Sequence, residues 1–259
     1  MPQFSPPHLA ALAVWVLATI VCVSAGRRAP PDARWPRWFG WALAALIIAF
    51  WAGEYVADVI TGVYTVRFTL PLQLTDLISV TSAYALITRQ RWAVELVYFW
   101  AFTATLQATL TPDLGYDFPS FYYFTYFGYH IGALLAGAFL VWGLRMKPRR
   151  WAALRTLLAT MGWAALAGTA DVITGGNYMY LAWKPSHGSL LSVLGPWPWY
   201  IAGALGAGIV LLAIVDVVTR LLWRVTEGPD DGRPTGVGVS DRSPGEAPTR
   251  AERDARVVG

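Results

Sequence analysis

The chain is dominated by long apolar stretches that are separated by short polar segments. Crossing the hydrocarbon of a bilayer takes about 20 apolar residues in a helix, and seven stretches approach or exceed this length. The expected helices span roughly residues 8–25, 38–60, 69–87, 92–110, 119–143, 151–174 and 197–222. The pattern therefore predicts an all-α, polytopic membrane helix bundle of about seven transmembrane helices over residues 1–222.

The composition agrees with a membrane protein. Hydrophobic residues make up 56% of the 259 residues and charged residues only 14%, whereas soluble domains contain about 25% charged residues. Residues 223–259 differ, because they are rich in Gly, Pro, Asp and Arg and show no apolar period. We expect this segment to be a disordered cytoplasmic tail. The net charge of +4 comes from loops between the helices, so a nucleic-acid partner is not expected.

Basic residues gather in alternate loops of the chain. Thirteen Lys and Arg residues flank or follow the first, third, fifth and seventh expected helices, whereas only Arg67 and Lys184 lie in the other loops. Loops rich in Lys and Arg remain on the cytoplasmic side of a membrane. The N-terminus is therefore expected outside the cell and the C-terminus inside.

Small residues follow one face of the last expected helix. Ala202 and Gly206 are four residues apart, and so are Ala204 and Gly208. Small residues at this spacing let helix backbones approach closely within a membrane. We expect this helix to pack closely against others of the same chain, with a dimer face as the alternative.

Ionisable side chains inside hydrocarbon are costly and usually mark a partner or a functional site. The candidates in the expected helices are Glu54, Asp58, Asp76, Glu95, His130, Asp171 and Asp216. Gln73, Thr75 and Gln107 add uncharged hydrogen-bonding groups. Most of the set falls in the outer half of the membrane, so we expect a shared polar cavity that opens toward the outer leaflet.

His130 has the strongest signal for a chemical role. It is interpreted as the one membrane-embedded histidine, and neutral imidazole is the usual general base near pH 7. Tyr123 and either Tyr126 or Phe127 precede it at helical spacing, so they are expected to form an aromatic wall beside the ring. Thr75 has two possible roles. Its hydroxyl is either a chemical group of the site or a donor to the carbonyl one turn back in its own helix.

Several chemistries lack the residues that they need. Both lysines, Lys147 and Lys184, lie in loops, so a retinal Schiff base within the bundle is not expected. The single Cys22 is distant from His130, which argues against a metal site built from His and Cys. No Gly-rich phosphate loop and no G-x-S-x-G turn occurs. The sequence therefore predicts neither a metal nor a cofactor.

Several motifs occur together in the order typical of one family. They are LPLQLTDL at 70–77, ELVYFWAFTATLQATLTPDL at 95–114, the segment from Phe118 to His130, and GGNYMYLAWKPSHGSLLSVLGPWPWY at 175–200. On these motifs, residues 38–222 resemble the YwaF-type bacterial integral membrane proteins. That family is similar in outline to the transmembrane acyltransferases that remodel ether phospholipids and, more distantly, to the androgen-induced hydrolases of fatty-acyl esters. The resemblance implies a multi-pass protein of the bacterial cell membrane.

The resemblance also implies a catalytic pair. In the related enzymes a Cys or Thr on one helix and a His on another are the proposed catalytic residues, which correspond to Thr75 and His130. Many YwaF-type members carry His and Cys in the segment that reads Gln73-Leu74-Thr75 here. A hydroxyl is a weaker nucleophile than a thiolate and depends on an adjacent base. The implied substrate is a membrane lipid, either a phospholipid or a fatty-acyl ester.

Supporting roles are assigned to the other polar residues of the outer half. Asp76 or Glu54 is a candidate to orient the imidazole of His130. Gln73, Asn177 and Tyr178 are candidate hydrogen-bond donors to an oxyanion. Gln107 and Tyr123 complete the set of candidate substrate-binding residues.

Two other functions would use the same features. A non-enzymatic carrier of lipids or small molecules would use Asp76 and Glu54 as proton or cation sites, although no internal repeat typical of transporters is visible. A structural scaffold would use the loop at 175–200 to bind another membrane protein. That loop has an alternative role as a cap that holds the last helix and shields the cavity. The oligomeric state remains open.

Overall fold

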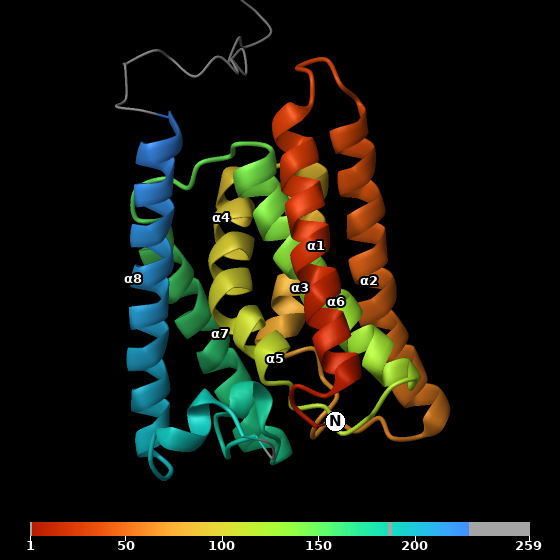
Figure 1. Cartoon of the computed structure of the whole chain (residues 1–259). Coiled ribbons are helices and arrows are strands. Elements are labelled where there is room, and N and C mark those ends of the chain that lie inside the picture. The colour runs from red at the N-terminus through yellow and green to blue at the C-terminus, as the bar shows by residue number, and fades with distance from the viewer. Residues whose placement is uncertain (1, 186–187, 228–259) are drawn as a thin grey trace, which may run out of the picture. The chain divides into compact units, whose positions relative to one another are not determined.

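All regular elements in the described part of the chain are helices. The computed structural model describes residues 2–185 and 188–227 (Figure 1). The chain divides into two compact units, Met1–Thr219 and Arg220–Gly259. Residues 223–227 of the expected tail still belong to the last helix, and the rest of the tail lies outside the described residues.

The helices follow the predicted order. They are α1 (Pro6–Arg28), α2 (Trp35–Thr61), α3 (Leu74–Thr88), α4 (Arg91–Trp100), α5 (Leu106–Leu110), α6 (Phe121–Ala138), α7 (Ala152–Thr174) and α8 (Trp199–Glu227). A π-helical turn, η1 (Ala101–Thr105), joins α4 to α5, and a second, η2 (Phe139–Gly143), extends α6. Two 3₁₀ turns, η3 (Tyr178–Tyr180) and η4 (Leu190–Val193), lie between α7 and α8.

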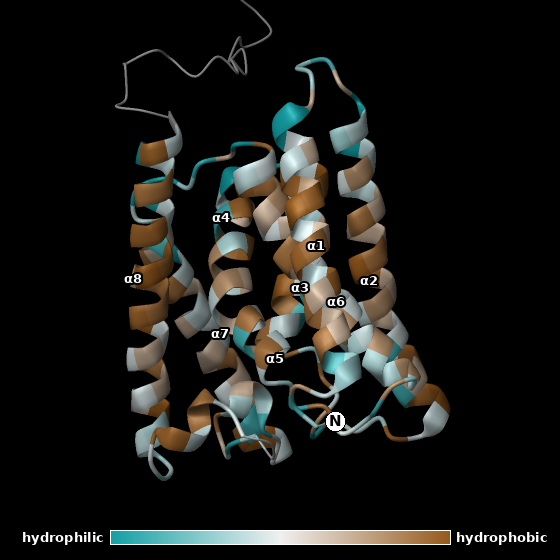
Figure 2. Cartoon of the chain, in the orientation of Figure 1, coloured by the Kyte–Doolittle hydropathy of each residue, from teal (hydrophilic) through white to brown (hydrophobic). Residues whose placement is uncertain are grey.

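Five helices in the described residues are long and apolar enough to cross a membrane. They are α1, α2, α6 with η2, α7 and α8. Helix α3 is an apolar helix of only 15 residues, and the run from α4 to α5 is interrupted by η1. Figure 2 shows apolar residues along the helices and more polar residues toward the loops. The all-α membrane architecture is thus confirmed, while the count of seven spans and their orientation stay predictions.

The first unit has two ends that differ in charge. One end, called here the basic end, carries the α1–α2, α3–α4 and η2–α7 connections, where Arg and Lys residues gather. The opposite end, called here the N-terminal end, carries the start of the chain and the connections α2–α3, α5–α6 and α7–α8 (Figure 1). The basic end is the one predicted to face the cytoplasm.

Helix α3 begins five residues later than predicted, at Leu74 instead of residue 69. Pro71 lacks a backbone N–H and disfavours a helical conformation at Leu70. The backbone N–H of Gln73 donates to Asp76 Oδ2 at 2.7 Å, which caps the helix at its start. Thr75 therefore lies in the first turn of α3 and not about six residues inside it.

Glycines on α6 allow α2 to pack closely against it. A Cβ atom added to Gly132 would lie 2.6 Å from Cγ1 of Ile47, a side chain that is fully buried. At Gly128 an added Cβ would overlap the Phe50 ring. In contrast, a Cβ at Gly206 or Gly208 of α8 would meet no atom of the described residues within 4 Å. The prediction that these two glycines of α8 pack closely within the chain is therefore wrong.

Gly132→Ala is expected to lower the thermal unfolding midpoint of the protein. The added methyl group meets buried Ile47, and overpacking of this kind costs about 1–3 kcal/mol. Gly208→Ala is the matched control, because it adds the same methyl group where no neighbour lies within reach. Tryptophan fluorescence during heating in one detergent measures both variants. Equal midpoints for the two variants would contradict the close packing of α2 against α6.

Candidate functional site

A buried carboxylate joins α2 to the start of α3. Oδ1 of Asp76 accepts hydrogen bonds from Nε1 of Trp51 at 2.8 Å and from the Tyr55 hydroxyl at 2.6 Å. Oδ2 accepts from the backbone N–H of Gln73. Asp76 is only 6% exposed, so its three donors replace the water that a carboxylate would otherwise bind. Both of its oxygens are committed to holding the fold.

A second carboxylate of α2 faces α6. Glu54 has Thr125 and Tyr129 as its hydrogen-bonding neighbours, and within the described residues its Oε2 atom has no partner. One turn later, Oδ1 of Asp58 accepts a hydrogen bond from the Tyr122 hydroxyl at 2.9 Å. Glu54 and Asp58 are four residues apart and share a helix face, and this face is directed toward α6.

The imidazole of His130 is held by its own helix. Nδ1 lies 2.7 Å from the main-chain oxygen of Tyr126. A carbonyl oxygen only accepts, so Nδ1 carries the hydrogen, and in the neutral ring Nε2 keeps its lone pair. The Tyr126 and Tyr129 rings lie with their centroids 4.2 Å and 4.6 Å from that of the imidazole. The predicted contact with Tyr126 is confirmed, and the group that orients the ring is a main-chain carbonyl instead of a carboxylate.

Thr75 has an uncommitted hydroxyl. The side chain is half-buried, and neither its Oγ1 nor its backbone N–H hydrogen-bonds to another described residue. The alternative expectation of a bond to the carbonyl one turn back is not met, because position 75 lies in the first turn of its helix, where backbone N–H groups lack partners as well. Thr75 and His130 do not hydrogen-bond to each other in the described structure.

Thr75 and His130 nevertheless lie at corresponding levels of neighbouring helices. Ile78 of α3 shares a buried apolar cluster with Ala133 and Leu134 of α6. Thr75 precedes Ile78 by three residues, and His130 precedes Ala133 by three residues. Each therefore lies about one turn nearer the N-terminal end on the same side of its helix. The hydroxyl and the imidazole thus lie on neighbouring helices and do not hydrogen-bond to each other.

Two candidate oxyanion donors have structural roles instead. Oδ1 of Asn177 accepts from the backbone N–H groups of residues 182–183 at 2.9 and 3.0 Å. The Tyr178 hydroxyl donates to the main-chain oxygen of Val66 at 2.8 Å and accepts from the N–H of Leu70 at 2.9 Å. Burial raises the pKa of the Tyr178 phenol, which keeps its hydrogen in place. Both side chains hold the loops of the N-terminal end.

The remaining candidates are distributed between the site and the scaffold. Oε1 of Gln73 accepts from the backbone N–H of Met179 at 2.8 Å, whereas its amide nitrogen makes no hydrogen bond to any described residue. The Tyr123 hydroxyl donates to the main-chain oxygen of Pro7 at 2.7 Å and fixes the start of α1. The side chain of Gln107 makes no hydrogen bond to the described residues. Gln73 thus borders the site, and neither Tyr123 nor Gln107 is brought to Asp76.

The described part of the loop at 175–200 is bonded to the N-terminal end of the bundle. Nε of Arg67 donates to the main-chain oxygen of Gly175 at 2.7 Å. The Tyr180 hydroxyl donates to Oδ2 of Asp113 at 3.0 Å, and burial raises the pKa of this phenol. The Tyr200 hydroxyl donates to the main-chain oxygen of Tyr180. These bonds agree with the interpretation of the loop as a cap.

Sequence reasoning missed the side chains of α2 that hydrogen-bond to Asp76. Trp51 and Tyr55 lie on α2 four residues apart, and both project the polar tip of an aromatic ring toward Asp76. The sequence offered one signal for them, because Trp51 and Tyr55 precede the carboxylates Glu54 and Asp58 of the same helix by three residues each. Aromatic residues with a polar tip also serve as interfacial anchors in membrane proteins, so the pattern alone does not separate the two roles.

His8 was also misinterpreted, because His130 is not the only buried histidine. His8 of α1 is fully buried. Its Nδ1 accepts from the backbone N–H of Phe4 at 2.9 Å, and its Nε2 donates to the main-chain oxygen of Thr109 at 2.9 Å. Both ring nitrogens of His8 are engaged, in contrast to His130, whose Nε2 makes no hydrogen bond to the described residues.

These observations define a polytopic helical membrane protein with a polar cluster at one end of its bundle. Within residues 2–185 and 188–227, no group of three or more His, Cys, Asp or Glu side chains is arranged to hold a metal ion. The model of the TMEM164 family matches residues 3–216, and the chain belongs to the TMEM164 family. No curated protein and no solved structure matches the sequence. The relation to YwaF-type proteins stays a prediction.

Asp76→Asn is expected to lower stability. The amide oxygen still accepts from Trp51 and Tyr55, but the amide nitrogen then faces the N–H of Gln73, and the helix cap is lost. Losing a hydrogen bond to a charged group costs about 1.5–3 kcal/mol. Asp58→Asn is the control, because the amide oxygen of this variant can still accept the hydrogen bond from the Tyr122 hydroxyl. Unfolding midpoints of the purified variants test the difference, and an unchanged Asp76→Asn midpoint would refute this role.

Proposed function

We propose that the protein is a lipid acyltransferase or acyl-ester hydrolase that uses Thr75 as its nucleophile and His130 as its general base. One observation carries the proposal. The uncommitted hydroxyl of Thr75 and the imidazole of His130, whose Nε2 makes no hydrogen bond to the described residues, lie at corresponding levels of α3 and α6. Other polar side chains nearby, such as Asp76, Asn177 and Tyr178, are engaged in holding the fold.

Formation of an acyl-enzyme is the first half of the proposed reaction. Nε2 of His130 takes the hydroxyl proton of Thr75 as Oγ1 attacks the ester carbonyl of a lipid. The hydrogen bond from Nδ1 to the Tyr126 carbonyl fixes the tautomer that this step requires. The imidazolium then returns the proton to the departing alcohol, and Thr75 carries the acyl group as an ester.

Acyl transfer or hydrolysis completes the cycle. The hydroxyl of a lysolipid, or water, attacks the Thr75 ester while Nε2 of His130 removes its proton. Thr75 leaves as the alcohol and recovers a proton from the imidazolium. The acceptor decides between transfer and hydrolysis. The reacting groups lie within an apolar bundle, which favours a substrate that is itself lipid.

The first turn of α3 supplies a candidate oxyanion site. The backbone N–H of Thr75 has no acceptor among the described residues, and the start of a helix carries a partial positive charge. The amide nitrogen of Gln73 is a second uncommitted donor next to it. Donors that face developing negative charge are a large source of catalytic stabilisation. We assign this role to Thr75 and Gln73 in place of Asn177 and Tyr178.

Thr75→Ala and His130→Gln are each expected to lower acyl turnover at least about 100-fold, the usual contribution of a positioned acid–base group. Thr75→Ser retains the hydroxyl and should retain turnover. Thr88→Ala is the matched control. Thr88 lies in α3 as Thr75 does, but near the basic end, and its hydroxyl donates to the main-chain oxygen of Tyr84. Each variant must unfold at the wild-type temperature for the comparison to count.

The assay uses the full chain in proteoliposomes with a fluorescent acyl phospholipid, with and without a lysophospholipid acceptor. Mass spectrometry of the lipids separates transferred from hydrolysed acyl groups. Wild-type turnover in Thr75→Ala or His130→Gln would reject the mechanism. Movement of intact lipid across the membrane without any new acyl product would assign the protein to the carriers instead.

A further inference from the structure

Two consecutive residues of the loop between α7 and α8 adopt a left-handed backbone. Met179 has φ 55° and Tyr180 has φ 57°. The Cβ atom makes this conformation unfavourable, so glycine usually occupies such positions. Other residues remain left-handed only where the surrounding structure holds them, and they gather at functional sites. The turn η3 therefore has a shape that the rest of the protein has to maintain.

Hydrogen bonds to three other segments hold this turn in place. The buried Tyr178 hydroxyl bonds to the main chain of the α2–α3 connection. The Tyr180 hydroxyl donates to Oδ2 of Asp113 in the α5–α6 connection, and the main-chain oxygen of Tyr180 accepts from the Tyr200 hydroxyl on α8. The residues on both sides of Met179 are thus fixed, which determines the direction of the N–H group between them.

The turn presents this N–H group to the candidate site. The backbone N–H of Met179 donates to Oε1 of Gln73 at 2.8 Å. An N–H group requires an acceptor, so the oxygen of the side-chain amide faces Met179 and the amide nitrogen faces away from it. That nitrogen makes no hydrogen bond to the described residues. The main chain of Met179 thus decides which end of the Gln73 amide is free, two residues before Thr75.

We propose that the main chain of Met179 is a positioning group that aims the amide nitrogen of Gln73 at the oxyanion of the acyl reaction. This inference rests on the proposed chemistry of Thr75. When Oγ1 of Thr75 attacks an ester, the carbonyl oxygen takes up negative charge, and donors that are already in place stabilise it. Met179 acts through Gln73 and does not touch the reacting atoms itself.

Met179→Val tests the positioning role. A β-branched residue tolerates a left-handed backbone poorly, so the turn shifts and its N–H moves away from Gln73. Misplacement of a catalytic group by about 1 Å can lower a rate about 100-fold, and kcat is expected to fall by about this factor with KM unchanged. Met179→Gly is the conservative variant, because glycine favours the same backbone and keeps the N–H. It should restore kcat in the proteoliposome assay.

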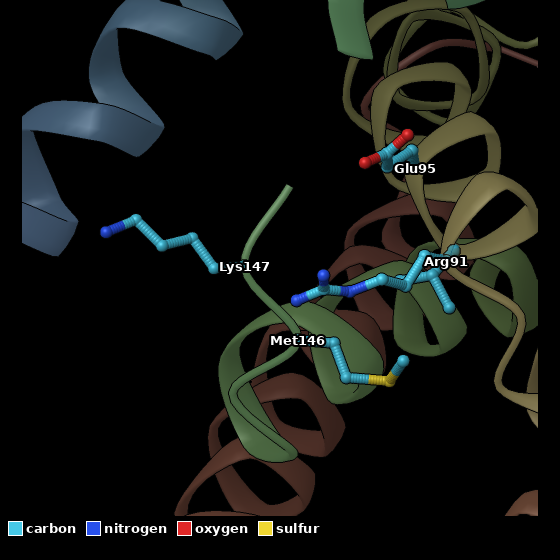
Figure 3. A pocket seen from close by; sticks show the side chains of 5 residues that line it. Arg91, Glu95, Met146 and Lys147 are labelled. Carbon is cyan, nitrogen blue, oxygen red and sulfur yellow. The ribbon is translucent and has the colours of Figure 1, made fainter. Parts of the chain in front are cut away.

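Arg145→Val is the matched control for backbone strain. Arg145 is also left-handed, with φ 57°, and directly precedes the segment of Met146 and Lys147 at the basic end (Figure 3). Its side chain is exposed and makes no hydrogen bond to the described residues. Arg145→Val should lower the unfolding midpoint as Met179→Val does, yet leave kcat unchanged. Equal losses of kcat in the two variants would attribute the effect to stability and overturn the proposal.

A double-mutant cycle determines whether Met179 acts through Gln73. Gln73→Leu removes the amide donor and is expected to lower kcat about 100-fold. Adding Met179→Val to Gln73→Leu should lower kcat no further, because the group that Met179 positions is gone. A further loss as large as that in the wild-type background would overturn the proposal.

The positioning role and the proposed function fail in different ways. Turnover that is lost in Thr75→Ala and unchanged in Met179→Val would reject the positioning role alone. Turnover that persists in Thr75→Ala would reject the acyl chemistry, and the role of Met179 with it.

Discussion

A carboxylate buried in an apolar bundle must receive its hydrogen bonds from the protein, and Asp76 imposes this condition on α2 and α3. Trp51 and Tyr55 have to face one atom of α3, which sets the rotation of α2. The N–H of Gln73 has to reach the other oxygen, which sets where α3 begins. The position of Thr75 in the first turn follows from these bonds. The hydroxyl of Thr75 thus lies where it does because of the hydrogen bonds that Asp76 accepts.

The polar groups of the N-terminal end fall into two kinds. Side chains such as Tyr178 and Asn177 use their donors and acceptors within the loops that they hold. The hydroxyl of Thr75, the Nε2 atom of His130 and the amide nitrogen of Gln73 make no hydrogen bond to the described residues. An unpaired polar group inside a bundle has a free-energy cost. Such a cost is readily explained where a substrate supplies the missing partner.

Much of the fold could be predicted from the sequence, because long apolar runs leave few alternatives to helices in hydrocarbon. The late start of α3 was missed, because Leu70 and Leu72 extend the apolar run ahead of the cap at Gln73, although Pro71 between them was a signal against a helix there. The candidate site was predicted in part. Polar residues inside an apolar run are conspicuous, whereas their partners depend on helix rotation. Asn177 illustrates the limit, because only the folded loop shows that its amide oxygen accepts from the backbone N–H groups of residues 182–183.

The shortness of α3 has a consequence for the surrounding lipid. Its 15 residues rise about 22 Å, against about 30 Å for the hydrocarbon of a typical bilayer. A mismatch of this size is met by local thinning of the leaflet or by other parts of the protein. Where the leaflet thins beside α3, glycerol esters sit closer to the bilayer midplane than elsewhere around the molecule. Under the proposed function, such thinning brings the ester bond of a lipid toward Thr75 while the lipid remains in its own leaflet.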